Sequence, residues 1–147
     1  NSSLMLFYVG DQRDASDLLE TQAVATAEKK GVLSAMSDMV DPMVEILSGR
    51  GDLSDVGPML HESWLLKRSI TDRISNDEID MAYGRAMEAG AAGGKLVGAG
   101  GGGFLMFFVE PSRQTDVATA LTGRPFIKPR FDTAGSRITY YEPDRLV

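Results

Sequence analysis

The sequence contains no cysteine and only one histidine among its 147 residues. The lack of cysteine excludes disulfides, thiolate chemistry and cysteine-ligated metal, and it fits a reducing compartment, so we expect a cytoplasmic protein. One histidine without a matched nucleophile does not suggest a catalytic triad. The acidic residues form neither a D-x-D-x-D nor an H-E-x-x-H arrangement, so we predict no metal site and no catalytic residue of that kind within this chain.

Positive charge and long apolar runs are also scarce. The chain has 15 basic and 21 acidic residues, a net charge of −6, which argues against the clustered lysine and arginine that nucleic-acid binding requires. Its longest apolar run, residues 104–109, is far shorter than the roughly 20 residues that span a bilayer. We therefore expect neither nucleic acid nor membrane as a partner, and a single domain over residues 1–147.

Glycine is concentrated in one segment. Residues 90–103 read GAAGGKLVGAGGGG and hold eight of the 16 glycines. Each ordered glycine costs roughly 0.5–1 kcal/mol relative to alanine, because more backbone freedom is lost on folding. The segment must therefore need either positive φ angles or the close approach of another group.

Apolar patterning predicts helices and strands in an order typical of an α+β fold. Expected strands span residues 4–9, 95–97, 104–109, 126–131 and 137–141, and expected helices span 14–30, 33–47, 53–70, 75–90 and 112–121. The last four strands lack intervening helices, apart from 112–121, which favours an antiparallel sheet with the helices gathered on one side. The first strand, a continuous apolar run, is predicted to be central and buried on both faces.

Local signals predict where the helices begin, bend and end. Gly31 is expected to end the first helix, and Pro42 to kink the second near residues 38–41, with Asp41 as a possible second cap. Ser75 stands in capping-box spacing before the fourth helix, and Ser112 is the expected cap of the last one.

The glycine-rich loop satisfies G-x-G-x-x-G in its letters only. That fingerprint must open a helix, and here an apolar strand follows, so a dinucleotide site is rejected. The Walker pattern fails because Ala89 and Leu96 stand where it needs glycine and Ser or Thr. Two interpretations remain: an anion-binding nest of backbone N–H groups with Lys95 close by, or a hairpin or bulge packed tightly against a helix.

The stretch HESWLLKRS carries the other candidate groups. His61 lies one turn from Trp64 and is either a packed helical histidine or a ligand contact. Lys67 and Arg68 are adjacent and so point to different sides of their helix. Either one binds a substrate phosphate, or both belong to a solvated helix C-terminus that favours cations.

Several segments together resemble the GHMP kinases. GGKLVGAGGGGFLMFFV is similar to the third, glycine-rich motif of that family. HESWLLKRS, ISNDEID and RFDTAGSRITYY are similar to the sugar kinases of the family that phosphorylate D-glycero-D-manno-heptose 7-phosphate. The resemblance covers most of the chain and implies a ferredoxin-like C-terminal domain.

The resemblance also implies a function and a missing partner. Family members are roughly twice as long, and their N-terminal half carries the P-x-x-x-G-L-G-S-S phosphate loop, which is not found here. ATP and Mg²⁺ are then expected to bind mainly to that absent half, with no catalytic residue in this chain, which alone would be inactive. The reaction implied is transfer of the γ-phosphoryl group to the anomeric hydroxyl of a sugar phosphate.

Within this chain the resemblance assigns the loop beside the ATP phosphates. The loop residues are Gly98, Ala99, Gly100, Gly101, Gly102 and Gly103. The candidates for binding the sugar phosphate are Lys67, Arg68, Lys95, Arg137 and His61. An apolar sheet face normally covered by the absent half would let the isolated chain form a homodimer.

Two other kinds of protein remain open from the sequence. One is a stand-alone small-molecule or anion-binding module on a ferredoxin-like fold, with the glycine loop as its anion site. The other is a purely structural or dimerising domain in which the glycines serve close packing. Ligand binding by the isolated chain separates the first from the second.

Overall fold

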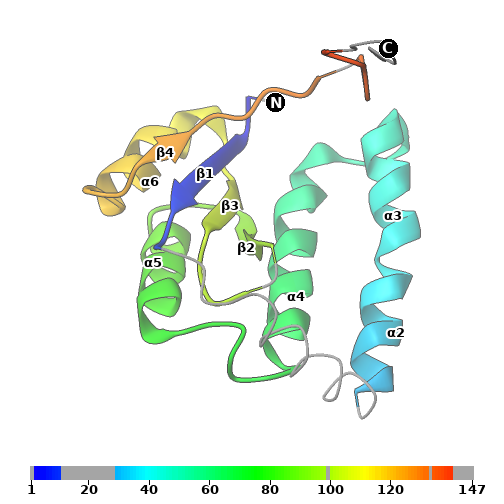
Figure 1. Ribbon diagram of the computed structural model, residues 1–147, viewed down its shortest axis with the longest axis horizontal. Helices are drawn as coiled ribbons and strands as arrows, with labels where there is room; N and C mark the ends of the chain where they lie inside the picture. Colours follow the sequence, from blue (N-terminus) through cyan, green and yellow to red (C-terminus); the bar gives the residue numbers. More distant parts are fainter. Residues whose placement is uncertain (1, 11–28, 99, 133, 141–147) are drawn as a thin grey trace, which may run out of the picture.

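The computed structural model describes residues 2–10, 29–98, 100–132 and 134–140. Four strands form one antiparallel sheet (Figure 1): β1 (Leu4–Tyr8), β2 (Gly93–Val97), β3 (Phe104–Phe108) and β4 (Phe126–Ile127). Their order across the sheet is β2-β3-β1-β4. This is the arrangement of a ferredoxin-like fold, so the predicted α+β class with an antiparallel sheet is confirmed, as is the inner position of β1.

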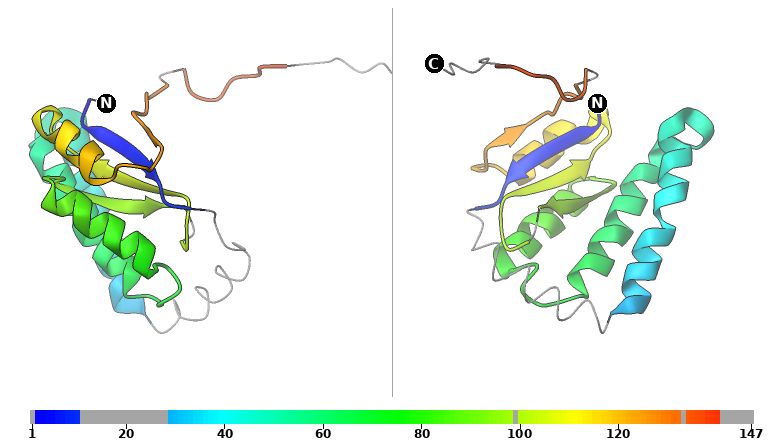
Figure 2. Two further views of the ribbon diagram at one scale, coloured as in Figure 1. Left: turned by 90° about the vertical axis from the view of Figure 1, so that its left-hand side faces the viewer. Right: turned by 45° about the vertical axis from the view of Figure 1, so that its right-hand side comes forward.

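The helices lie on one face of the sheet, as Figure 2 shows most clearly in its left view. They are α2 (Lys30–Asp38), α3 (Val40–Glu45), α4 (Val56–Arg68), α5 (Asp77–Glu88) and α6 (Gln114–Ala120). Short turns of helix join them: the π-helical η1 (Ile46–Arg50) and the 3-10 helices η2 (Leu53–Asp55) and η3 (Pro111–Arg113). The α4 helix runs beside edge strand β2, and the α2–α3 pair runs beside α4 (Figures 1 and 2).

The core lies between the sheet and these helices. Phe7 of β1 and Phe107 of β3 point to the helical side, are fully buried and meet edge to face with ring centroids 6.2 Å apart. Trp64 of α4 and Tyr83 of α5 complete the aromatic cluster. Each such buried side chain contributes roughly 1.5–3 kcal/mol of hydrophobic stabilisation, so this cluster fixes α4 and α5 on the sheet.

The opposite face of the sheet is mostly apolar, with Lys95 on edge strand β2 paired to Met106, and it has no described helix over it. Its half-buried side chains are Leu4, Leu6, Tyr8, Phe104, Met106 and Phe108. We call these six residues the open sheet face. The prediction that the first strand is buried on both faces was therefore wrong, because an antiparallel sheet with one helical layer buries every second residue.

Local signals placed α5 well. Its predicted inward residues Ile79, Ala82, Tyr83 and Ala86 are all buried, and Gly90 follows its end with a φ of +105°. The N-cap is Asn76, whose side chain accepts a hydrogen bond from the Ile79 N–H at 2.9 Å. The predicted cap was one residue early, since the Ser75 hydroxyl donates to Asp80 instead.

The α2–α3 pair bends where expected but packs less than its apolar pattern suggests. The break between the helices falls at Met39, three residues before Pro42, which confirms the predicted kink. Asp41 does not cap α3, and Gly31 lies inside α2 instead of ending the preceding helix. Neither α2 nor α3 contains a buried residue.

The remaining differences concern the chain ends. Ser112 does not cap the last helix, because Pro111 starts a 3-10 turn that leads into α6. The expected strand 126–131 is reduced to two residues. Residues 137–140 form no strand, so the prediction of a last strand there was wrong. Residues 14–28 of the first predicted helix lie outside the described part. In residues 2–10, 29–98, 100–132 and 134–140 no helix is long and apolar enough to cross a membrane.

Candidate functional site

The loop between β2 and β3 explains most of the local glycine content. Gly98, Gly100, Gly101 and Gly103 have φ angles of +100°, +135°, +73° and +100°. Residues other than glycine rarely adopt such φ angles. Ala99 lies outside the described residues. The loop therefore uses glycine to follow a path that other residues disfavour.

Two amide groups of this loop are already engaged. The Gly101 N–H donates to the Ile74 carbonyl at 3.0 Å, and the Gly103 N–H donates to the Gly10 carbonyl at 2.9 Å. Gly100, Gly101 and Gly102 are buried, whereas Gly98 is exposed. In this conformation a nest cannot use the amides of Gly101 and Gly103, so an anion at the loop needs other donors.

Two lysines supply positive charge at the exposed end of the loop. Lys67, near the C-terminus of α4, donates from its Nζ to the Gly98 carbonyl at 2.6 Å. Burial, together with the charge of Lys95, lowers the pKa of Lys67. Lys95 lies on β2, with its Nζ 3.5 Å from the Ser63 Oγ. The two ammonium groups thus lie within electrostatic reach of each other.

Neither of these lysines is neutralised within the described part of the chain. The ion pairs found there join other residues: Arg50–Glu45, Arg68–Asp80, Arg113–Asp116, Arg124–Glu78 and Arg137–Asp132. Two cations that repel each other and have no carboxylate partner favour an anion between or beside them. We call Lys67, Lys95 and the loop residue Gly98 the lysine site.

The other sequence candidates are engaged elsewhere. Arg68 donates to the Asp80 carboxylate at 2.6 Å and lies over the Trp64 ring, 5.8 Å from its centroid. Arg137 lies near Asp132, at 3.6 Å, in an exposed tail segment. The structure therefore brings Lys67 to the loop and Lys95 beside Ser63 of α4, whereas Arg68 and Arg137 already have carboxylate partners.

His61 belongs to a chain of hydrogen bonds that leads from α4 to β2. Its Nδ1 lies 2.7 Å from the Tyr83 hydroxyl, which donates to the Gly94 carbonyl at 3.1 Å. Burial raises the pKa of Tyr83 to about 12, so the phenol stays neutral. The packed interpretation of the lone histidine thus has a specific partner, which the sequence did not reveal.

Sequence reasoning also missed Ser63. It stands four residues before Lys67, the spacing that places two side chains on one side of a helix. That spacing was a usable signal. The Ser63 hydroxyl accepts a long hydrogen bond from the Lys95 ammonium.

Close packing accounts for two further glycines of the rich segment. A Cβ on Gly93 would meet the Gly57 backbone of α4, and one on Gly94 would meet Met106 and Phe107 of β3. The expected close approach of another group is therefore found at the start of β2, while positive φ angles explain the loop. Chemically, the site offers cations for a phosphate, and the described residues include no group of three or more acidic or histidine side chains that could hold a metal ion.

Comparison with known proteins places this geometry in a family. Residues 43–128 match the family model described as GHMP kinases C terminal. The chain is 32% identical over 119 residues to the D-glycero-alpha-D-manno-heptose 7-phosphate kinase of Campylobacter jejuni, covering 80% of this chain and 35% of that protein. It is 36% identical over 112 residues to the mevalonate kinase of Pyrococcus horikoshii, covering 73% of this chain and 33% of that protein. The chain thus spans about a third of the length of these curated relatives.

Solved structures show the same fold. The mevalonate kinase of Methanococcus jannaschii superposes with a TM-score of 0.72 at 19% identity, over 84% of this chain and 38% of that one. The L. major mevalonate kinase, solved with R-mevalonate, gives a TM-score of 0.70 at 19% identity, over 86% of this chain and 42% of that one. The family match over residues 43–128 agrees with the four-stranded antiparallel sheet and its helical layer. The chain therefore belongs to the GHMP kinases, whose C-terminal domain it represents.

Proposed function

We propose that this chain is the C-terminal domain of an ATP-dependent sugar kinase that phosphorylates the anomeric hydroxyl of a heptose 7-phosphate. The observation that supports the proposal most is the lysine site, where Lys67 contacts the glycine loop and Lys95 lies within electrostatic reach, neither with a carboxylate partner among the described residues. The similarity to the Campylobacter jejuni heptose 7-phosphate kinase, which extends over 80% of this chain, supports the choice of a heptose 7-phosphate.

The role proposed for this chain is to hold and orient phosphate. In the reaction, the acceptor hydroxyl oxygen forms a bond to the γ-phosphorus of ATP, the bond from that phosphorus to the bridging oxygen breaks, and the hydroxyl proton leaves to a base. Catalysis of this type depends mainly on positioning and on electrostatic stabilisation. Lys67 and Lys95 suit the first task, since Lys67 donates to the loop carbonyl of Gly98 and the Lys95 ammonium lies close enough to act on Lys67 electrostatically.

Most of the catalytic machinery is proposed to lie outside this chain. The described residues fit phosphate but not Mg²⁺, which prefers carboxylate oxygens that the lysine site lacks. We place ATP, Mg²⁺ and the base mainly on an N-terminal domain of the same protein, and the whole enzyme in the cytoplasm. The open sheet face is the proposed contact for that domain or, in the isolated chain, for a second copy.

Enzyme assays test the proposal. The isolated 147-residue chain should form no ADP from ATP, Mg²⁺ and heptose 7-phosphate, whereas the longer gene product that contains it should. Saturable turnover by the isolated chain would contradict the division of labour. Turnover of mevalonate but not of heptose 7-phosphate by the longer protein would contradict the substrate. Tight binding of one metabolite by the isolated chain, without turnover in any context, would favour the binding module.

Substitution of one lysine tests the site itself. Lys67→Gln in the longer protein should raise the KM for heptose 7-phosphate by about 10- to 100-fold, because a charged hydrogen bond contributes about 1.5–3 kcal/mol. The matched control is Lys30→Gln, at an exposed position where α2 begins. Equal effects of the two substitutions on this KM would contradict the proposed role of the lysine site in substrate binding.

A further inference from the structure

A groove between the α2–α3 pair and α4 is lined by half of the protein's methionines. Met36, Met39, Met43 and Met59 line it together with two valines and a leucine, and its volume is about 290 Å³. This is close to the lower end of the range for small-molecule sites, about 300 Å³. Methionine side chains are unbranched and polarizable, so they adapt to ligands of different shape.

The described residues leave this groove unfilled. Neither α2 nor α3 has a buried residue, and the groove valines Val40 and Val44 are 56% and 49% exposed. The break at Met39, three residues before Pro42, separates two short helices that share the groove wall. A ligand that covers this exposed apolar surface removes it from water, which lowers the free energy of the complex.

One end of the groove is cationic. Lys95 and Ser63 are its polar lining residues, and the Lys95 ammonium has no ion-pair partner among the described residues. Lys67 adds a second positive charge close to that end. The complement of this surface is a molecule with an apolar body and one anionic end.

We propose that the groove binds an amphipathic anion, with a hydrocarbon chain on the four methionines and a phosphate or carboxylate on Lys95. A sugar does not suit it, because most of its hydroxyl groups would be buried without hydrogen-bond partners. The groove thus adjoins the proposed acceptor site and takes a ligand of different chemistry. It shares Lys95 with the lysine site but does not depend on phosphoryl transfer.

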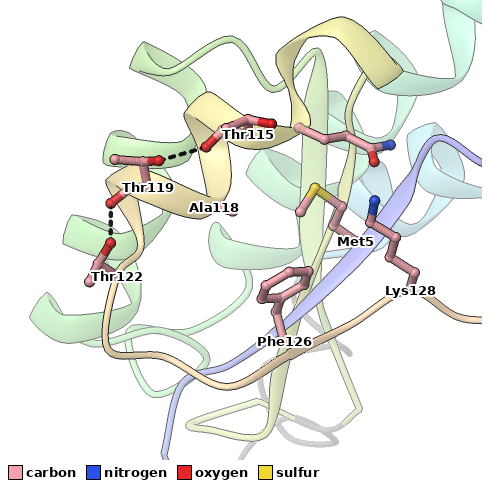
Figure 3. A pocket seen from close by; sticks show the side chains of 8 residues that line it. Met5, Thr115, Ala118, Thr119, Thr122, Phe126 and Lys128 are labelled. Atoms are coloured by element: carbon pink, nitrogen blue, oxygen red, sulfur yellow. Dashed lines mark hydrogen bonds between the residues drawn. The ribbon is translucent and has the colours of Figure 1, made fainter.

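A second hollow, between α6 and β4, is the natural comparison (Figure 3). It measures about 310 Å³ and also has one lysine, Lys128, on the side opposite the threonines of α6. The hydroxyls of Thr119 and Thr122 donate to the carbonyls of Thr115 and Thr119, so both hydroxyl donors are already engaged in local hydrogen bonds. Met5 is the one methionine that lines this hollow.

Methionine methyl NMR distinguishes the two hollows directly. In the 147-residue chain labelled at its eight methionine methyl groups, octyl phosphate below its critical micelle concentration should shift Met36, Met39, Met43 and Met59 saturably. Met5 should not shift. Inorganic phosphate, which lacks the chain, and octyl glucoside, which lacks the charge, should each bind the groove at least tenfold more weakly.

Substitutions then test the assigned anion contact. Lys95→Gln should weaken octyl phosphate binding about tenfold or more, Lys95→Arg should retain it, and Lys128→Gln should leave it unchanged. The Met5 methyl signal reports whether each variant is folded. The proposal is overturned by shifts confined to Met5 and lost in Lys128→Gln, by equal binding of octyl glucoside, or by no saturable shift of the groove methyls. None of these outcomes bears on whether the longer protein is a kinase.

Discussion

The backbones of Gly57 and Gly93 meet with no side chain between them. A Cβ built on Gly93 would lie 1.8 Å from the Gly57 carbonyl oxygen and 2.5 Å from its carbonyl carbon. This contact joins α4 to edge strand β2. It sets the distance between the helix that carries Lys67 and the strand that carries Lys95.

We expect Gly93→Ala to lower the free energy of unfolding by about 3 kcal/mol or more, because both colliding groups are backbone and cannot rotate away. Urea denaturation measures the change. The matched control is Gly84→Ala inside α5, where an added Cβ meets nothing within 4 Å. That control should stabilise by up to about 1 kcal/mol through helix propensity. Similar effects at the two positions would contradict the close contact.

The Asn76 cap of α5 should be worth about 1 kcal/mol. Asn76→Ala removes the acceptor for the Ile79 N–H, whereas Asn76→Asp keeps an oxygen there. Thermal denaturation of the two variants should therefore show a clear loss for alanine and little loss for aspartate. Equal loss in both would place the effect outside the cap.

The buried hydroxyl of Tyr83 leads us to expect that the free energy of unfolding falls at alkaline pH. Its pKa is raised from 10.0 to about 12, chiefly by burial, so the native state holds the proton where the unfolded state has released it. The contribution of the neutral phenol is therefore complete below pH 10 and is lost as the pH rises from 10 to 12. The unfolding free energy should therefore fall more between pH 9 and pH 11 for the wild type than for Tyr83→Phe. A parallel fall in both proteins would contradict the assignment.

The open sheet face predicts that the isolated chain self-associates. Burial of its apolar side chains against a second copy should give a concentration-dependent dimer in sedimentation experiments. Met106→Lys places a charge on that face and should favour the monomer, while Met81→Lys, at a 58% exposed position of α5, should not. A wild-type chain that remains monomeric at high concentration would refute the prediction.

The parts of the fold that the sequence predicted well are those with local causes. The inward stripe of α5 and its terminal Gly90 follow from spacing and backbone freedom alone, and both were found as expected. The kink before Pro42 has the same local origin. The α+β order of elements also sufficed for an antiparallel sheet with helices on one side.

The errors concern properties that depend on a partner. Residues 138–140 are Ile, Thr and Tyr, types suited to a strand, but a strand also needs a neighbouring strand to pair with, and residues 137–140 form no strand. The apolar stripe of α2 and α3 predicted helices but could not tell whether another surface covers them. At the candidate site, the sequence made Lys67 and Lys95 candidates for binding phosphate, which stays a prediction, and it did not foresee that Asp80 engages Arg68.

The lack of buried residues in α2 and α3 has a consequence for hydrogen exchange. A helical segment held by little buried apolar surface can open without unfolding the sheet, so its amides should exchange well before those of β1 and β3. The groove wall would then form and dissolve many times during one lifetime of the native sheet. An occupant of the groove should be detectable as slower deuterium uptake confined to residues 30–45.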